Sequence, residues 1–224
     1  MFNIINRRTL RFYINNYEGA KTALEIWYDE FVNAEHTNFN ELKRYFPSAS
    51  LIGDDRVIFN IKDNQFRLIV RVVFTFRVIQ IKWFGTHKEY DRIDPLKVSI
   101  KKQLKMKLSL IRSEKEYERL LDWIDLQFDL GIQPDSEEGE QVQIALLLVK
   151  QWEDLHYPIA HADPIEAIKL RMEEMGIRNK DLVERNYGSK GHVSMLLNRK
   201  KSLTIDLARR FHKELGIPAE VFLG

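Results

Sequence analysis

The feature that most constrains the fold is a change in the spacing of apolar residues near position 50. From Phe66 to Phe74 an apolar side chain stands at every second position, which is the period of a strand. A β-rich run over residues 56–61 precedes it, the turn signal Asp63-Asn64 separates the two, and a further apolar run covers 78–84. These runs predict an antiparallel sheet in the middle of the first half of the chain.

The residues before position 50 have helical spacing instead. Apolar side chains recur at intervals of three and four within residues 7–15 and 18–34, and a short helix is predicted over 39–46, ended by Pro47. Helices followed by a sheet are the order of an α+β fold.

Composition narrows the class of protein. A chain of 224 residues with 44% hydrophobic and 30% charged residues is expected to form two or three globular domains. It contains no cysteine, which excludes disulfides and thiolate chemistry, and its six histidines lack zinc-ligand spacing, so we expect no metal and no cofactor. Residues 1–10 lack a signal-peptide core, and the apolar run 144–149 is too short to span a bilayer. A cytoplasmic protein is predicted.

Charge is distributed in three blocks. Residues 1–105 hold 18 basic and 12 acidic residues, 106–160 hold 5 and 12, and 161–224 hold 12 and 9. Basic blocks are expected where a protein binds a phosphate backbone, and the acidic block could compete for the same surface. The alternative is that the acidic block is the solvated face of two helices.

A polar stretch, Thr86 to Asp91, directly follows the third apolar run. It holds an imidazole, an ammonium, a phenol and two carboxylates at the end of a strand, where side chains can reach a ligand. Arg67 and Arg71 share one face of the preceding strand and are predicted to oppose its apolar face. They could clamp a phosphate, or they could lie there because that face meets water.

The first 98 residues closely resemble HigB toxins of type II toxin-antitoxin systems. The resemblance rests on F-P-S-A from position 46, V-I-F-N-I at 57–61, F-R-L-I-V-R-V at 66–72 and G-T-H-K-E-Y-D-R-I at 85–93, in this order. It implies a RelE-like α+β fold that cleaves messenger RNA, usually on the translating ribosome and without metal. In such a reaction the 2′-hydroxyl attacks the adjacent phosphate.

That reaction needs a proton acceptor, a proton donor and cations near the phosphorus. The residue types present at the predicted strand and its end supply all three, and the predicted catalytic residues are Arg67, Arg71, His87 and Tyr90. Lys43, Arg44 and Lys88 are predicted to bind RNA.

Residues 94–106 are predicted to be a basic junction, after which Met106 looks like the start of a separate protein. Ser113 and Glu116 form a capping box for a helix that ends near Gly131, and a second helix follows Pro134. Asp163 and the proline after it then begin a series of short helices.

Two of these short helices, over 179–185 and 189–197, are joined by a tight turn around Tyr187-Gly188, which is typical of a helix-turn-helix. The stretches D-P-I-E-A-I, G-S-K-G-H-V-S-M-L-L-N-R-K-K-S-L-T and L-G-I-P-A-E resemble the HigA antitoxin, an Xre/Cro-type repressor module. This resemblance covers residues 106–224.

If residues 189–197 are a recognition helix, their first turns enter the major groove. The predicted DNA-binding residues are Asn179, Lys180, Ser189, Lys190, His192, Ser194, Arg199, Lys200 and Lys201. The alternative is a helix-turn-helix that serves only for packing or dimerisation.

The predicted architecture is therefore an α+β RelE-like toxin domain (1–98), a basic tether with an acidic helical antitoxin region (99–160) and an all-α helix-turn-helix domain (161–224). The resemblance implies that the antitoxin blocks the toxin, in cis or in trans, through Glu114, Glu116, Glu118, Asp122, Asp125 and Asp129. We expect a homodimer that cleaves messenger RNA, is neutralised by its own antitoxin part and binds operator DNA. The alternatives are a repressor with an inactive toxin-like domain and an RNA-binding scaffold without cleavage.

Overall fold

A computed structural model describes residues 1–93 and 108–223. The predicted junction over 94–106 therefore lies outside the described residues. The chain divides into two compact units. The sheet unit consists of Met1–Asn16 and Phe31–Ile159, and the helical unit consists of Tyr17–Glu30 and Ala160–Gly224. Residues 17–30, from the predicted toxin domain, thus group with the last 65 residues of the chain.

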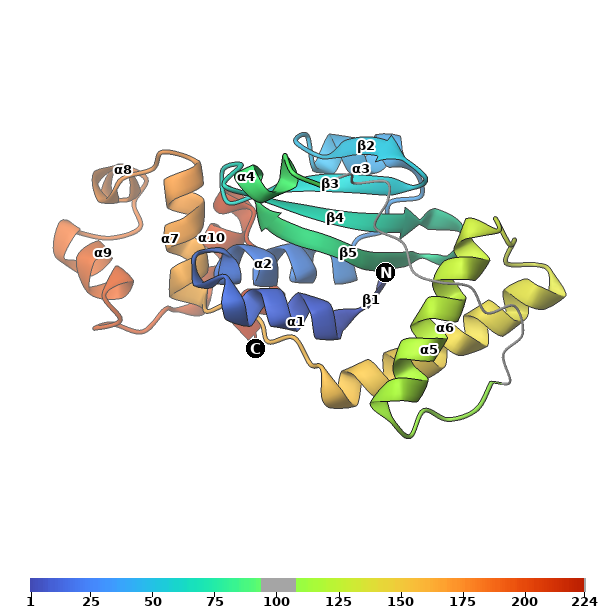
Figure 1. Cartoon of the computed structure of the whole chain (residues 1–224). Helices are drawn as coiled ribbons and strands as arrows, with labels where there is room; N and C mark the ends of the chain where they lie inside the picture. Colours follow the sequence, from blue (N-terminus) through green and yellow to red (C-terminus); the bar gives the residue numbers. More distant parts are fainter. Residues whose placement is uncertain (94–107, 224) are drawn as a thin grey trace. The chain divides into compact units, whose positions relative to one another are not determined.

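Within the described part of the sheet unit, five strands form one mixed sheet in the order β1-β5-β4-β3-β2 (Figure 1). Strands β2 (Ser50–Gly53), β3 (Arg56–Ile61), β4 (Phe66–Val73) and β5 (Val78–Thr86) pair antiparallel, as the alternation predicts. Strand β1 (Asn3–Ile5) pairs parallel with β5. The expectation of a purely antiparallel sheet was wrong at this edge, because a three-residue strand is too short to show a period of two.

The helices of the sheet unit are α1 (Arg7–Asn16), α3 (Phe39–Tyr45), α4 (His87–Tyr90), α5 (Glu114–Asp129) and α6 (Glu137–His156). Asn38, Ser113 and Ser136 cap α3, α5 and α6 by accepting a backbone N–H with their side chains. In Figure 1, α4 lies at one end of the β4–β5 pair and the α5–α6 pair lies toward the other end. No helix among the described residues is long and apolar enough to cross a membrane.

Strand β4 is buried on both faces, which corrects the prediction that the face of Arg67 and Arg71 opposes the apolar one. Every residue from Leu68 to Val73 is buried, Arg71 included. Val73 forms one apolar core with Ile5, Val78 and the inner faces of α5 and α6. The sheet face that was expected to meet water is thus partly covered by helices that lie far downstream in the sequence.

A β-bulge in β5 changes which side chains share a face. Ile69 pairs with Trp83 but Val70 pairs with Ile81, so Lys82 is an additional residue in β5. The bulge shifts the alternation and places Trp83 on the face of Ile69, opposite to Ile81. An unbroken alternation through residues 78–84 would put Ile79, Ile81 and Trp83 on one face, and the bulge prevents this.

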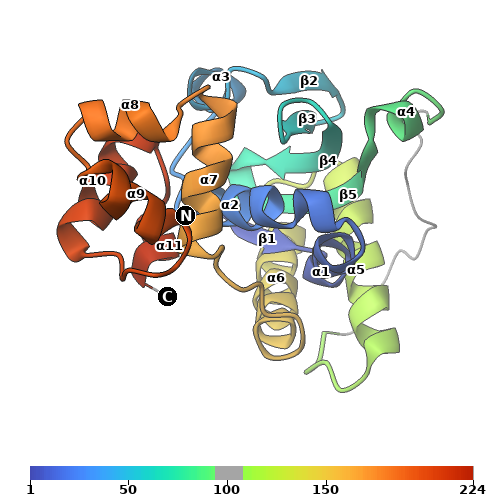
Figure 2. The same cartoon turned by 90° about the vertical axis from the view of Figure 1, so that its left-hand side faces the viewer.

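The helical unit contains α7 (Pro164–Glu174), α8 (Asn179–Glu184), α9 (Lys190–Leu197), α10 (Ile205–Leu215) and α11 (Glu220–Leu223), which are shown together in Figure 2. Asp163 caps α7 by accepting the N–H groups of Ile165 and Glu166, as predicted. A short turn, Arg185 to Ser189, joins α8 to α9.

Most of α2 (Lys21–Val32) also belongs to the helical unit, although it lies near the start of the chain. Ile26 of α2 lies in the apolar core of α7–α11. Asp29 contacts Nδ1 of His161 at 2.8 Å, and Glu30 accepts a hydrogen bond from Arg171 at 2.5 Å. Residues near the start of the chain are therefore needed to complete the core formed near its end.

Candidate functional site

The polar stretch Thr86–Asp91 folds as a capped helical turn. The hydroxyl of Thr86 accepts the N–H of Glu89, and the Glu89 carboxylate accepts the N–H of Thr86 at 2.7 Å. This backbone hydrogen bond holds the pKa of Glu89 below its usual range. The cap fixes α4 at the end of β5, and a helical spacing of three brings His87 and Tyr90 to one side.

Arg67 is the centre of the site. Its Nη2 lies 2.8 Å from Nε2 of His87, and its guanidinium carbon lies 4.7 Å from the ring centroid of Tyr90. Arg67 is directly opposite Gly85 in the β4–β5 pair. The structure thus brings three of the four predicted catalytic residues together at one end of the sheet.

The imidazole of His87 is held from both sides. Its Nδ1 lies 3.2 Å from Oδ2 of Asp91, one helical turn further on. Because a guanidinium can only donate, the contact with Arg67 requires Nε2 to be the acceptor and Nδ1 to carry the proton toward Asp91. The His87 side chain is 46% exposed, so an oriented imidazole remains open to solvent.

Arg71, the fourth predicted catalytic residue, lies apart from this group. A strand rises by roughly 3.3 Å per residue, which places Arg71 about 13 Å along β4 from Arg67. Arg71 is 4% exposed, and its Nη1 donates to Asp129 at 2.6 Å and to Asp125 at 3.4 Å. Two carboxylates of α5 therefore occupy this guanidinium.

Two further buried cations lie beside Arg71. Lys82, in the bulge of β5, contacts the same Asp125 carboxylate, and Arg56 is the direct partner of Arg71 in the β3–β4 pair. Burial lowers the pKa of the Lys82 ammonium in spite of Asp125. Sequence reasoning missed both residues, because neither the bulge nor the burial of this face can be read from alternation alone. Asp91 was also missed, although its spacing of four from His87 was a usable signal.

The predicted RNA-binding residues of the sheet unit lie on two helices. The ammonium of Lys43, on α3, donates to the carbonyl of Ala49 at 2.5 Å. Arg44 is exposed near the end of α3, and Lys88 is exposed on α4 beside His87.

Carboxylates of α5 also contact α1. Arg8 pairs with Glu114 at 2.9 Å and with Glu118 at 2.5 Å. Four of the six acidic residues expected to face the first part of the chain, Glu114, Glu118, Asp125 and Asp129, therefore form ion pairs with it. Asp122 lines a pocket together with Asn6, Arg8 and Gln80, and burial raises its pKa, whereas Glu116 accepts the N–H of Arg112 within its own capping turn.

The predicted DNA-binding residues all lie in the helical unit. Among them, eight are exposed: Asn179, Lys180, Ser189, Lys190, Ser194, Arg199, Lys200 and Lys201. His192 instead packs against Gly188, where an added Cβ would come within 2.9 Å of the imidazole. Arg199 forms hydrogen bonds to Asp163 at 2.8 and 2.9 Å and to Glu166 at 3.0 Å.

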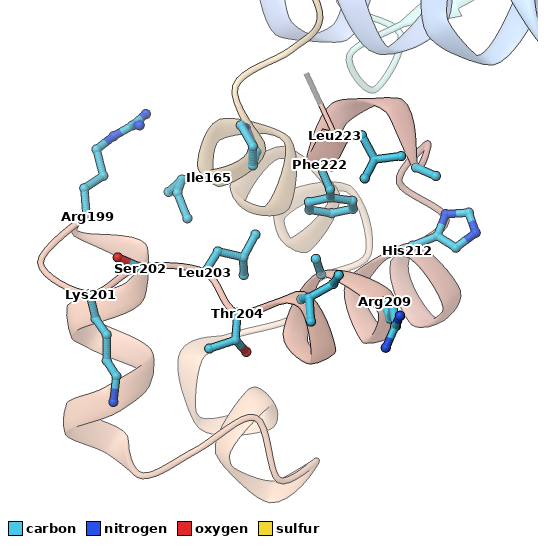
Figure 3. Close-up of a pocket in the computed structure, with 14 residues that line it drawn as sticks. Ile165, Arg199, Lys201, Ser202, Leu203, Thr204, Arg209, His212, Phe222 and Leu223 are labelled. Carbon is cyan, nitrogen blue, oxygen red and sulfur yellow. The ribbon is translucent and has the colours of Figure 1, made fainter.

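A groove of about 710 Å³ lies next to these basic residues in the helical unit. Figure 3 shows Ile165, Leu203 and Phe222 gathered in its centre, whereas Arg199 and Lys201 point away from it. The groove is therefore mainly apolar. Among the described residues, no group of three or more histidine, aspartate or glutamate side chains is arranged to hold a metal ion.

The fold and the site define a class of protein: an α+β domain with a guanidinium, an imidazole and a phenol in contact at one end of its sheet. Residues 20–93 match the family model of HigB toxins, described as the RelE-like toxic component of a toxin-antitoxin system. The matched stretch runs from the start of α2 through α4 and ends before α5. No curated protein matches the chain significantly.

Proposed function

We propose that the chain is a metal-independent endoribonuclease that cleaves messenger RNA on the translating ribosome and is restrained by its own α5. The observation that carries the proposal is the contact of Arg67 with both His87 and Tyr90, within the stretch that matches HigB toxins. These are the residue types that attack by a 2′-hydroxyl requires.

In this reaction the incoming phosphate draws the Arg67 guanidinium away from His87. The freed Nε2 then accepts the proton of the 2′-hydroxyl, whose oxygen forms a bond to phosphorus as the bond to the 5′-oxygen breaks. Tyr90 donates a proton to the leaving oxygen, and Asp91 keeps the imidazole in the required tautomer. The products are a 2′,3′-cyclic phosphate and a 5′-hydroxyl.

The restraint arises from α5. Asp125 and Asp129 neutralise Arg71 on the sheet face along which the RNA backbone would continue. Asp125 also forms an ion pair with Lys82. Arg71, Lys82 and Asp125 are buried, whereas Asp129 is partly exposed, so these negative charges compete directly with phosphates for cations that are largely shielded from water. We propose that this neutralisation acts in cis.

We further propose that the helical unit binds operator DNA through α8 and α9 as a helix-turn-helix and represses its own synthesis as a homodimer. Ser189, Lys190 and Ser194, exposed on the first two turns of α9 and its cap, are of the kind that reaches base edges. Lys200 and Lys201 follow α9 and suit phosphates.

The nuclease proposal is tested by following messenger RNA in a translating extract. The full chain with Asp125→Asn and Asp129→Asn should cleave faster than the wild type, and adding His87→Ala should remove the gain. Glu138→Gln, at an exposed carboxylate of α6, is the matched control. Intact messages with the folded Asp125→Asn, Asp129→Asn chain would reject the nuclease.

One observation favours the alternative of a repressor with an inactive toxin-like domain. The apolar core shared by α5, α6 and the sheet gives the helices that cover Arg71 a structural role as well. This alternative predicts no cleavage by any variant, with DNA binding intact.

A further inference from the structure

Trp83 lies on the same face of the sheet as Arg67. The bulge at Lys82 places it opposite Ile69, two residues along β4 from Arg67. Trp83 is only half-buried, whereas Trp27 and Trp123 are 3% and 4% exposed. A large aromatic side chain is therefore held next to the candidate site and is partly open to solvent.

The indole of Trp83 extends along β5 toward α4. A Cβ added at Gly85 would lie 2.7 Å from Cζ2 and 2.8 Å from Cη2 of the indole, which means that the ring lies across the backbone of Gly85. Gly85 is thus needed for this orientation, since any larger residue would displace the ring.

Trp83, Tyr90 and Arg67 form a continuous series of planar groups. The ring centroids of Trp83 and Tyr90 are 6.1 Å apart at an angle of 56°, and Arg67 lies over the Tyr90 ring. Nothing in the proposed bond-making and bond-breaking steps uses the indole. Its position instead suits an unpaired nucleobase, because single-stranded RNA is bound largely by stacking on aromatic faces.

We propose that Trp83 stacks on the base of a nucleotide next to the cleaved phosphate and so positions single-stranded RNA on Arg67 and His87. This inference rests on the proposed ribonuclease function and names Trp83 as a positioning residue. Stacking of this kind tolerates any base, so Trp83 contributes affinity and orientation for RNA chains of any sequence.

The test uses the full chain and a single-stranded RNA oligonucleotide whose 2′-hydroxyls are methylated, so that it cannot be cleaved. Affinity is measured by anisotropy of a labelled end, and contact with the indole by quenching of tryptophan fluorescence. Trp83→Ala should weaken binding about tenfold or more. Trp83→Phe should retain most of the affinity but lose the quenching, and Gly85→Ala should resemble Trp83→Ala.

Trp152→Phe, on α6, is the matched control and should keep both the affinity and the quenching. The proposal is overturned if the wild type does not bind the oligonucleotide, or if Trp83→Phe quenches as the wild type does. If the Trp83→Ala chain does not fold, the Trp83→Phe chain still tests the proposal, because RNA should no longer quench its tryptophan fluorescence. Binding with quenching but no cleavage of messenger RNA would reject the nuclease and leave the stacking role of Trp83 intact.

Discussion

Arg67 donates to Nε2 of His87 while Asp91 faces Nδ1 on the other side of the ring. As the acceptor of the Arg67 hydrogen bond, Nε2 carries no proton in the resting structure. The guanidinium therefore occupies the ring atom that would have to accept a proton. A phosphate that binds Arg67 would release this atom at the moment when it is needed. In the proposed reaction, substrate binding and activation of the base would therefore be coupled through the side chain of Arg67.

This coupling predicts a graded series of losses in messenger RNA cleavage. His87→Ala removes the base and should slow cleavage by about 10²–10⁴-fold. Asp91→Asn leaves the base but weakens its orientation, so a loss of roughly tenfold is expected. Both are measured in the chain with Asp125→Asn and Asp129→Asn, and Asp54→Asn in an exposed turn is the control. Equal losses in Asp91→Asn and Asp54→Asn would contradict the tautomer argument.

The ion pairs between α5 and the sheet unit should differ in their contribution to stability. Arg71→Ala leaves a buried Asp125 with one cation fewer and should lower the free energy of unfolding by about 3 kcal/mol. Arg8→Ala breaks pairs whose side chains are exposed, so a change of about 0–1 kcal/mol is expected. Urea unfolding of the two variants measures both values. Similar values would show that burial of Arg71 does not strengthen its pairs.

Burial raises the pKa of Glu25, on α2, to about 7. Because this folded-state value exceeds the ordinary 4.5, the contribution of Glu25 to stability is full below pH 4.5 and is lost as the pH rises through about 7. Glu25→Gln removes the titration and should be more stable than the wild type at pH 8 but not at pH 4.5. Thermal unfolding at both pH values checks this, and a constant difference between the two chains would contradict it.

Substitutions in α9 should distinguish residues that contact DNA from residues that pack within the helical unit. Lys190 is exposed, so Lys190→Ala should weaken binding to the DNA upstream of the chain's own gene without changing the melting temperature. The imidazole of His192 packs on Gly188, so His192→Ala should lower both affinity and melting temperature. Lys213→Ala on α10 is the control. Unchanged affinity in Lys190→Ala would count against α9 as the recognition helix.

Much of the sheet unit could be predicted from local patterns. The alternation of β4 and the turn before it depend on neighbouring residues alone, and so does the polar stretch that became α4. The pairing of Arg67 with His87 follows once β4 and β5 are antiparallel neighbours.

The position of Arg71 could not be predicted in the same way. Arginine at alternate positions of a strand is normally a sign of a solvated face. Here the face is covered by α5, a helix more than 40 residues further along the chain, whose approach leaves no trace in the sequence of β4. The bulge at Lys82 could not be predicted either, because it depends on pairing with β4 and not on the composition of β5.

The order of elements along the chain determines when during synthesis α5 can begin to act on the sheet in the proposed restraint. All strands of the described sheet precede α5, so during synthesis the complete sheet is made before the carboxylates that neutralise Arg71. At about 5–20 residues per second, the ribosome adds α5 and α6 within several seconds of finishing α4. In the proposed function, translation that stops between α4 and α5 would therefore yield the toxin-like elements without the carboxylates that neutralise Arg71, and synthesis of α5 would be the step that restrains the nuclease.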